Sequence, residues 1–291
     1  MCKVIGFAQE ILPCYNKSEE NSFFNREGEN MNIVVDTHSH TIASGHAYSS
    51  IREMAEAGKK AGLKMLAITD HTPSLPGGPH EFYFHNLRVI PRDYYALPLL
   101  IGAEVNITNV EGQVDLSPGL LKEMDIVIAS IHGPTFGTDY CTDTYTHEKY
   151  TMEDYTDAYL GAMRNPFVHV IGHPDDSRYL PNYELLVQGA KETGTLLELN
   201  NTSLSPTTFR HNSRENILQM LDLCKEKEVM ITTGTDSHVE AQVGKFAQVQ
   251  EVLAYCNFPA ELVASTNVEL LLAWIAKKSE NQECDSPKGM Y

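Results

Sequence analysis

The chain has 291 residues, 42% of them hydrophobic, which is enough to bury the core of one large domain or two ordinary ones. Its formal net charge of −17, from 39 acidic and 22 basic residues, argues against nucleic acid or an anionic membrane as the main partner. No apolar run reaches about 18 residues, and no signal peptide is recognisable. The six cysteines are scattered and form no C-x-x-C pair. We therefore expect free thiols and a cytoplasmic location.

The first part of the chain differs from the rest. Residues 17–32 are polar and lack a periodic pattern, and the first convincing strand begins at Ile33. We therefore expect an N-terminal appendage without ordered structure over residues 1–30, with Met31 as an alternative start. A folded domain over residues 31–278 and a C-terminal tail over residues 279–291 complete the predicted organisation.

From Ile33 onward, short apolar runs alternate with stretches of helical spacing. Seven runs suit strands buried on both faces of a parallel sheet, at residues 33–36, 64–69, 99–104, 125–130, 168–172, 195–199 and 229–234. Helices are expected at about 49–61, 152–164, 183–193, 214–227, 246–255 and 267–277. Ser49 or Ser50 would cap the first helix, and Gly62 would end it. This alternation predicts an α/β fold, either a (β/α) barrel or, as the alternative, a doubly wound open sheet.

Histidines and acids follow the predicted strands. His38 and His40 come directly after the first strand, and residues two apart in an extended segment point the same way. His46 follows in a loop where Gly45 permits a tight approach. The second, third, fourth, fifth and seventh strands end close to His71, Glu104, His132, His173, Asp236 and His238. Because ligands gather at the carboxyl ends of parallel strands, these nine groups are predicted to meet.

A cluster of this size predicts a site for several metal ions. Imidazole suits Zn, Fe and Mn, and a carboxylate can bridge two ions. One metal takes about four protein ligands at most, so nine groups imply more than one ion, and three ions is the simplest division. A lone histidine near a strand is more often structural, and this interpretation applies first to His80, His85, His147, His169 and His211.

The motifs carry a family resemblance. DTHSH at 36–40, TDH at 69–71, GHP at 172–174 and TDSH at 235–238 resemble the PHP (polymerase and histidinol phosphatase) superfamily. Residues 31–275 are similar to its YcdX-type phosphatases through THSHTIASGHAYSS, AITDHTPSLPGGPH, NLRVIPR, IGAEVNI, LELNNTS and GTDSHV. The resemblance implies a PHP metallohydrolase domain with a distorted seven-stranded (β/α) barrel. It also implies a trinuclear metal site at the C-terminal ends of the strands, usually of zinc, with Mn or Fe as alternatives.

The resemblance further implies how the ligands divide. One metal would be held by His38, His40, Glu104 and Asp236. Glu104 would bridge to a second metal, held by His132 and His173. The third would be held by His46, His71 and His238. The stretch 135–150 looks longer than in the related proteins, and it would reshape the substrate mouth beside His132.

The expected activity is hydrolysis of phosphomonoesters by hydroxide that the metals activate, without a covalent enzyme intermediate. Glu104 and Asp236 would act in catalysis through the metals, and bound cations would attract an anionic substrate despite the acidic surface. Arg88 and Arg92 are candidates for binding phosphate, with a surface salt bridge as the alternative. Arg178 and Arg214 are weaker candidates for the same contact. Asn200 and Asn201 are candidates for orienting substrate or the histidine ligands, with a turn-forming pair as the alternative, and His80 is a candidate general acid, with a hydrogen bond in its loop as the alternative.

Other functions remain open at this point. One is a histidinol-phosphate phosphatase, which performs the same chemistry on one substrate. Another is a nuclease or other phosphodiesterase of the same superfamily, against which the net charge of −17 counts. A third is a metal-storage or sensor module without turnover. The expected partner is a small phosphorylated substrate, and a homo-oligomer is compatible with the sequence.

Overall fold

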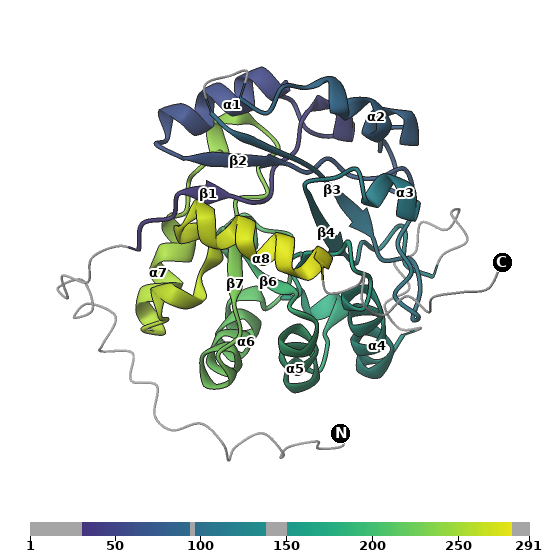
Figure 1. Cartoon of the computed structure of the whole chain (residues 1–291). Helices are drawn as coiled ribbons and strands as arrows, with labels where there is room; N and C mark the ends of the chain where they lie inside the picture. Colours follow the sequence, from purple (N-terminus) through teal and green to yellow (C-terminus); the bar gives the residue numbers. More distant parts are fainter. Residues whose placement is uncertain (1–30, 94–96, 138–149, 281–291) are drawn as a thin grey trace, which may run out of the picture. The chain divides into compact units, whose positions relative to one another are not determined.

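A computed structural model describes residues 31–93, 97–137 and 150–280, and the structural statements below concern those residues. Seven parallel strands pair in chain order in a single sheet (Figure 1). They are β1 (Val35–Asp36), β2 (Met65–Ile68), β3 (Leu99–Asn106), β4 (Ile126–Ser130), β5 (Val170–Ile171), β6 (Leu196–Asn200) and β7 (Ile231–Gly234). All seven strands predicted from the sequence are confirmed.

The two edges of the sheet meet, so that the strands enclose a nearly complete barrel. The backbone N–H of Thr37 donates to the carbonyl oxygen of Thr233 at 3.3 Å, next to the ends of β1 and β7. Further along, His40 N donates to Ser237 O at 2.8 Å, and Asp236 N donates to His38 O at 2.9 Å. The barrel is therefore confirmed over the open sheet, and its closure places segments about 200 residues apart side by side.

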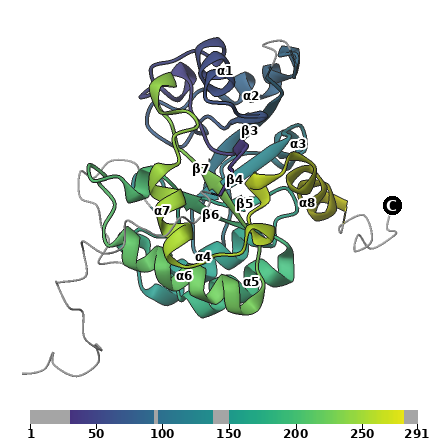
Figure 2. The same ribbon diagram turned by 90° about the vertical axis from the view of Figure 1, so that its left-hand side faces the viewer.

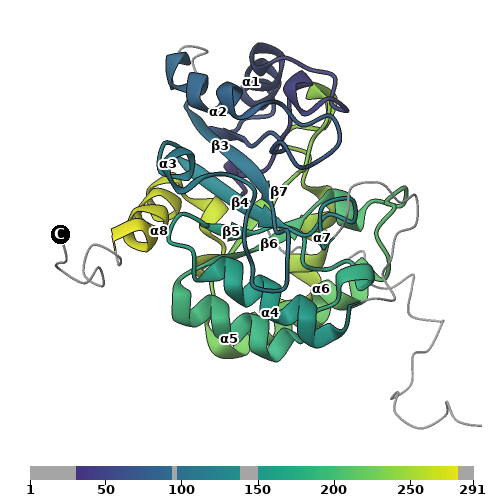
Figure 3. The same cartoon turned by 90° about the vertical axis from the view of Figure 1, so that its right-hand side faces the viewer.

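Helices surround this sheet on several sides. They are α1 (Ile51–Lys60), α2 (Glu81–Asn86), α3 (Pro118–Leu121), α4 (Met152–Met163), α5 (Tyr183–Thr193), α6 (Ser213–Lys227), α7 (Ala247–Tyr255) and α8 (Val268–Glu280). Figure 2 and Figure 3 show α4, α5 and α6 side by side along one side of the sheet, with α1 on the opposite side. No helix in the described ranges is both long and apolar enough to cross a bilayer.

Local sequence explains where α1 begins and ends. The Ser50 hydroxyl accepts from the backbone N–H of Glu53, whose carboxylate accepts from Ser50 N at 2.7 Å, which forms a capping box. Gly62 follows the helix with φ at +86°, a conformation that glycine adopts without strain. Of the two predicted caps, Ser50 is the correct one. The sequence missed α2 and α3, whose six and four residues are too few to show a helical period.

Helix α8 closes the amino end of the barrel. Its Leu271 and Ile275 belong to an apolar cluster with residues from the interior of the strands, among them Val35 and Ile128. The buried Lys278 side chain donates to the carbonyl oxygens of Met163 and Thr193 and to the Thr195 hydroxyl. Since these contacts occupy one end of the barrel, the carboxyl end is left for the candidate site.

His169 lies at this closed end and has a structural role, as its position within a strand pattern predicted. Its Nδ1 accepts from Val127 N at 3.0 Å, and Nε2 lies 3.1 Å from the Ser279 hydroxyl of α8. Burial, and after it the nearby charge of Lys278, lowers the pKa of His169 from 6.5 to about 3. The folded protein therefore holds this imidazole neutral well into the acid range.

This buried imidazole predicts sensitivity to acid. As the pH falls from 6.5 toward 3, the unfolded chain binds a proton at His169 and the folded chain does not, so the free energy of unfolding decreases. The expected contribution is up to about 1.4 kcal/mol per pH unit. Urea unfolding at pH 7 and pH 5 should show a smaller loss for His169→Gln than for the wild type. His85→Gln, which changes a half-buried imidazole away from α8, is the control, and an equal loss in both variants would contradict the prediction.

Candidate metal centre

The structure brings all nine predicted ligands together at the carboxyl end of the barrel. They extend from the fully buried His38 to the exposed His46, so the cluster reaches the solvent. His71 and Glu104 lie side by side, because the backbone pairing of the second and third strands continues beyond β2 as a parallel bridge between these two residues. The members of the cluster are His38, His40, His46, His71, Glu104, His132, His173, Asp236 and His238.

Glu104 is the centre of this cluster, and five imidazoles surround its carboxylate. Oε2 lies 2.8 Å from a nitrogen of His71, 3.4 Å from His38 and 3.5 Å from His40. Oε1 lies 2.9 Å from Nε2 of His173 and 3.4 Å from that of His132. Each carboxylate oxygen thus faces a different set of histidines, which is the arrangement needed to bridge two metal ions.

Asp236 supplies a second carboxylate. Its Oδ1 lies 3.2 Å from Nε2 of His40, 3.7 Å from Nε2 of His38 and 3.6 Å from Nδ1 of His238. Asp236 and His173 both have positive φ, at 54° and 27°, which costs free energy in a residue other than glycine. The fold holds this local strain at two of the candidate ligands.

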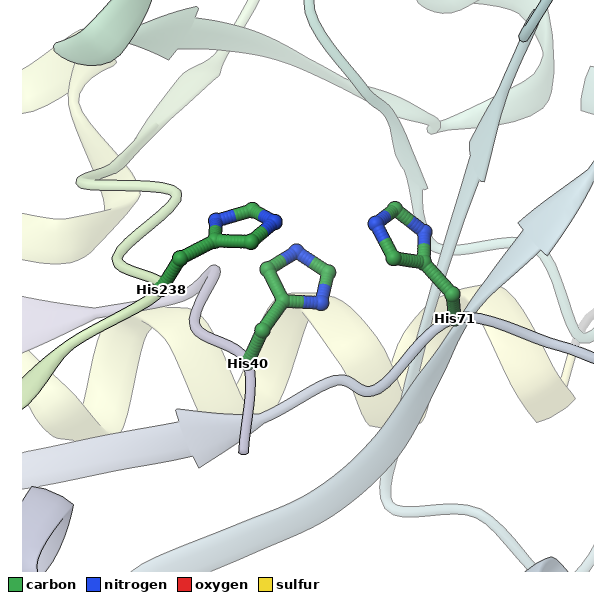
Figure 4. A group of neighbouring side chains, drawn as sticks. All are labelled: His40, His71 and His238. Atoms are coloured by element: carbon green, nitrogen blue, oxygen red, sulfur yellow. The ribbon is translucent and has the colours of Figure 1, made fainter. Parts of the chain in front are cut away.

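The donor atoms fit metal ions. Nε2 of His38 and Nε2 of His40 lie 3.0 Å apart, and Oε2 of Glu104 and Nδ1 of His71 are buried without a hydrogen-bond partner although they lie 2.8 Å apart. Metal ions would satisfy such lone pairs, and imidazole with carboxylate is a typical zinc set. Within the described ranges, three groups of three residues have ligand atoms within 4.8 Å of one another: His40, His71, His238; His38, His40, Glu104; and His71, Glu104, His132. Figure 4 shows the rings of the first group turned toward one another.

These groups agree in part with the division that the family resemblance implies. His38, His40 and Glu104 are three of the four ligands expected for one metal. His71 was expected with His46 and His238, yet its imidazole belongs to one group with His40 and His238 and to another with Glu104 and His132. The assignment of each histidine to one ion therefore stays a prediction.

Hydrogen bonds fix which ring nitrogen several histidines direct toward the cluster. Nδ1 of His38 lies 2.7 Å from Oε1 of Glu198, and Nδ1 of His132 lies 2.7 Å from Oδ1 of Asn106. Because an ionised carboxylate and an amide oxygen only accept, each Nδ1 carries the proton and each Nε2 is free to bind metal. The Asn106 amide is itself oriented, since its nitrogen donates to Asp115 at 2.8 Å.

His40 is held by a similar chain. The Ser44 hydroxyl donates to Oδ1 of Asp70 at 2.7 Å, so it accepts from Nδ1 of His40 at 3.3 Å. Asp70 also accepts from the Tyr83 hydroxyl at 2.5 Å. Tyr83 belongs to α2, the short helix that sequence reasoning missed, and α2 thereby stabilises the orientation of a candidate ligand.

The charges around the cluster favour ionised acids. Burial raises the pKa of Glu104 and Asp236, but the positive charge of His38 and other groups outweighs it and holds both well below their ordinary range. Burial and the neighbouring histidines lower the pKa of His40 well below its ordinary value. Ionised carboxylates and neutral imidazoles are the forms that bind a metal ion. Burial lowers the pKa of His38, but the charges of Glu198, Glu104 and Asp236 outweigh it and raise this pKa well above its ordinary value, so His38 would release a proton on binding a metal.

Glu198 is a functional residue that sequence reasoning missed. It lies inside β6, where its carboxylate also accepts from His173 N at 2.8 Å and from the Asn200 amide at 3.2 Å. Residues 198 and 200 alternate onto one face of the strand, which is the signal that could have revealed the pair. Of the two asparagines proposed earlier, Asn200 lies at the site, whereas the side chain of Asn201 accepts from Val249 N of α7.

A conservative change at Glu198 should weaken metal binding. Glu198→Gln leaves an amide beside Nδ1 of His38 in place of an ionised acceptor, and loss of such a partner costs roughly 10- to 100-fold in metal affinity. Elemental analysis after dialysis against graded chelator would measure this, with the exposed Glu56→Gln of α1 as control. Equal metal retention in Glu198→Gln and Glu56→Gln would contradict the assigned role.

The structure does not bring Arg88 and Arg92 to the cluster in the same way. Arg88 is exposed on the short 3₁₀ helix η3 (Leu87–Val89). Arg92 Nε donates to Asp125 at 2.7 Å, next to the amino end of β4, and so forms the salt bridge that was the alternative to phosphate binding. The backbone carbonyl of Arg92 accepts from Leu99 N at the start of β3. This hydrogen bond holds the segment at the amino end of the barrel, away from the cluster.

Among the described residues, the arginine in contact with the cluster is Arg210, which sequence reasoning did not single out. Its buried guanidinium donates to Oδ2 of Asp236 at 2.9 Å and to the Ser203 hydroxyl at 3.1 Å. Of the weaker candidates, Arg178 pairs with Asp176 and Arg214 pairs with Glu251. Arg210 is therefore a guanidinium in direct contact with a candidate metal ligand.

Two other predictions concern loops. His80 is exposed and caps α2, because its Nδ1 accepts from Phe82 N at 3.1 Å. This contact is the structural alternative to a role as general acid.

Most of the stretch 135–150, together with His147, falls within residues 138–149, which lie outside the described ranges.

Comparison with known proteins agrees with this geometry. A model of the PHP domain matches residues 36–231, more than half of the chain. A protein of Acetivibrio thermocellus named a probable phosphatase is 40% identical over 250 residues, which cover 86% of this chain and 98% of that protein. A probable phosphatase of Clostridium novyi is also 40% identical over 250 residues, 86% of this chain and 97% of that protein.

A solved structure shares the fold. Histidinol phosphate phosphatase of Lactococcus lactis, in complex with zinc, L-histidinol and phosphate, superposes with a TM-score of 0.53 at 18% identity. The match covers 78% of this chain and 95% of that one. At this identity the likeness concerns the barrel architecture and not the substrate.

Proposed function

Because this chain belongs to the PHP-domain family, we propose that it is a metal-dependent phosphatase that hydrolyses small phosphomonoesters. The observation that carries the proposal is the cluster around Glu104, in which two carboxylates and seven imidazoles converge at the open end of the barrel. The names of the relatives, probable phosphatases at 40% identity, support the same reaction class.

Zinc is the proposed cofactor, with three ions per chain and Mn or Fe as alternatives. The nitrogen-rich donor set supports it, and so does the zinc in the Lactococcus lactis structure. Metal ions bound there would supply a water of lowered pKa and would neutralise phosphate oxygens. Nine ligands shared among three ions leave positions open for substrate.

The residues of this chain would divide the remaining work. Glu104 holds the cluster together because both of its oxygens face imidazoles, and Asp236 joins His40 to Arg210. We place Arg210, rather than Arg88 or Arg92, at the phosphate. Its guanidinium lies at the carboxyl end of the barrel beside a ligand, and arginine pairs with phosphate through two parallel hydrogen bonds.

A second candidate is hydrolysis of histidinol phosphate in particular. The fold likeness to an enzyme solved with L-histidinol favours it, although nothing in the Glu104 cluster selects that alcohol. A nuclease is less compatible with a net charge of −17.

One assay series separates these functions. The metal-loaded protein would be incubated with p-nitrophenyl phosphate, histidinol phosphate, bis(p-nitrophenyl) phosphate and an oligonucleotide, with metal content measured in parallel. The proposal predicts turnover of monoesters and little of diesters. Preference for diesters would favour a nuclease, and a metal-loaded protein inactive on all four would favour a binding module.

A further inference from the structure

An exposed phenyl ring lies one side chain away from the candidate metal centre. Phe209 precedes Arg210 in the segment between η6 (Thr202–Leu204) and α6, and it is 66% exposed. The guanidinium carbon of Arg210 lies 5.3 Å from the centre of the Phe209 ring, and the same guanidinium group donates to Asp236. The ring therefore lies beside the site and faces solvent.

A second arginine contacts the same ring. The guanidinium carbon of Arg178 lies 5.3 Å from the ring centre of Phe209, within the range of a cation–π interaction. Arg178 is itself fixed, because its Nε donates to both oxygens of Asp176 at 3.0 and 2.9 Å. Both cations that hold the ring are thus tied to buried carboxylates, at Asp176 and Asp236.

The backbone beside the ring is also tied down. Ser177 N, next to Arg178, donates to the carbonyl oxygen of His211 at 3.0 Å. On the other side, Arg210 N donates to the Thr208 hydroxyl at 3.2 Å. A ring that is held on both sides and still exposed is organised before anything binds, which lowers the entropic cost of binding.

We propose that Phe209, with Arg178 packed against it, forms the subsite for the organic part of the substrate, and that this part carries a flat aromatic group. The inference rests on the proposed phosphatase function and adds the substrate class to it. With the phosphate at the metals and Arg210, the organic part extends toward Phe209, the exposed aromatic ring in contact with Arg210. Aromatic pairs stack in offset or edge-on geometry.

A different role must be separated from this one. Single exposed phenyl rings are common, and Phe209 could serve only to shield the Arg210–Asp236 pair from water. A shield would affect every substrate and the metal content alike. A substrate subsite affects only substrates with an aromatic group, mainly through KM.

The chain offers a matched control. Phe82 of α2 is 68% exposed, and its ring centre lies 6.4 Å from that of His85. It is therefore a phenyl ring of similar exposure on a helix elsewhere in the barrel. Phe82→Ala removes the same apolar group without touching either arginine.

The experiment compares phenyl phosphate with glycerol phosphate as substrates for the wild type, Phe209→Ala and Phe82→Ala. We expect Phe209→Ala to raise KM for phenyl phosphate by about 5-fold or more, while glycerol phosphate kinetics and metal content stay at the level of Phe82→Ala. Phe209→Tyr should retain the wild-type preference. Equal losses on both esters, or no loss on either, would overturn the subsite.

A binding measurement keeps this outcome separate from failure of the phosphatase function. If the wild type turns over neither ester, the proposed function fails, and calorimetry with phenylphosphonate and methylphosphonate still tests the subsite. Tighter binding of phenylphosphonate by the wild type, lost in Phe209→Ala, supports the proposal. Equal affinity of the wild type for both phosphonates contradicts it.

Discussion

Glu104→Ala is expected to lose at least one metal ion per chain and more than about 100-fold of the phosphatase activity. Removing a residue that only orients a metal ligand already lowers metal affinity or activity roughly 10- to 100-fold. Glu104 is itself a candidate ligand and contacts five imidazoles, so a larger loss is expected. The variant also removes the negative charge that lies between these imidazoles. Metal content by elemental analysis is the primary measurement, with phosphomonoester turnover as the second.

The control for this variant is Glu123→Gln, which removes an exposed carboxylate paired with His85. Surface pairs of this kind contribute about 0–1 kcal/mol, so metal content and turnover should stay at the wild-type level. Glu104→Gln tests whether charge or volume matters, because the amide fills the same space. Full metal content and full turnover in Glu104→Gln would contradict the bridging role.

Much of the barrel and its ligands could be predicted because strands carry a regular signal. Each buried run shows where its carboxyl end lies, and parallel strands bring those ends to one rim. His132 and His173 were predicted in this way, each two residues beyond a strand end. The positions of His132 and His173 therefore follow from the strands alone.

The residues that were missed depend on tertiary structure. Glu198 lies within an apolar strand and reaches the site only because the barrel is closed, which sets its carboxylate against His38. Arg210 lies ten residues beyond the end of β6, in a segment without periodic pattern. Its contact with Asp236 on another strand end follows from the path of that loop, which local propensity does not determine.

The choice between cations shows the same limit. Arg88 and Arg92 were favoured because they follow the long loop after the second strand and because arginine pairs with phosphate through two hydrogen bonds, yet Asp125 holds Arg92 at the amino end of β4. Nothing in the spacing of residues 88–92 distinguishes a surface salt bridge from a phosphate contact. The end of the barrel at which a side chain lies decides its function, and only the fold supplies that information.

Arg210→Ala is the second change with a large expected effect. It removes the guanidinium that donates to Asp236, and removal of one donor that stabilises charge in a transition state costs roughly 10²- to 10³-fold in kcat. Because Arg210 is buried and leaves an unpaired carboxylate behind, the melting temperature should fall as well. Arg210→Lys keeps the charge but lacks the planar fork, so we expect a smaller loss of stability and still a marked loss of turnover.

The measurements are kcat and KM for a phosphomonoester, metal content, and thermal unfolding for both variants. Arg214→Ala serves as control, since Arg214 pairs with Glu251 on the exposed surface and should leave turnover unchanged. If Arg210 acts on the phosphate, Arg210→Lys loses turnover while it retains the metal ions. If it acts only by orienting Asp236, metal content falls in parallel with activity. Wild-type turnover in Arg210→Lys would show that the guanidinium does not take part in the reaction.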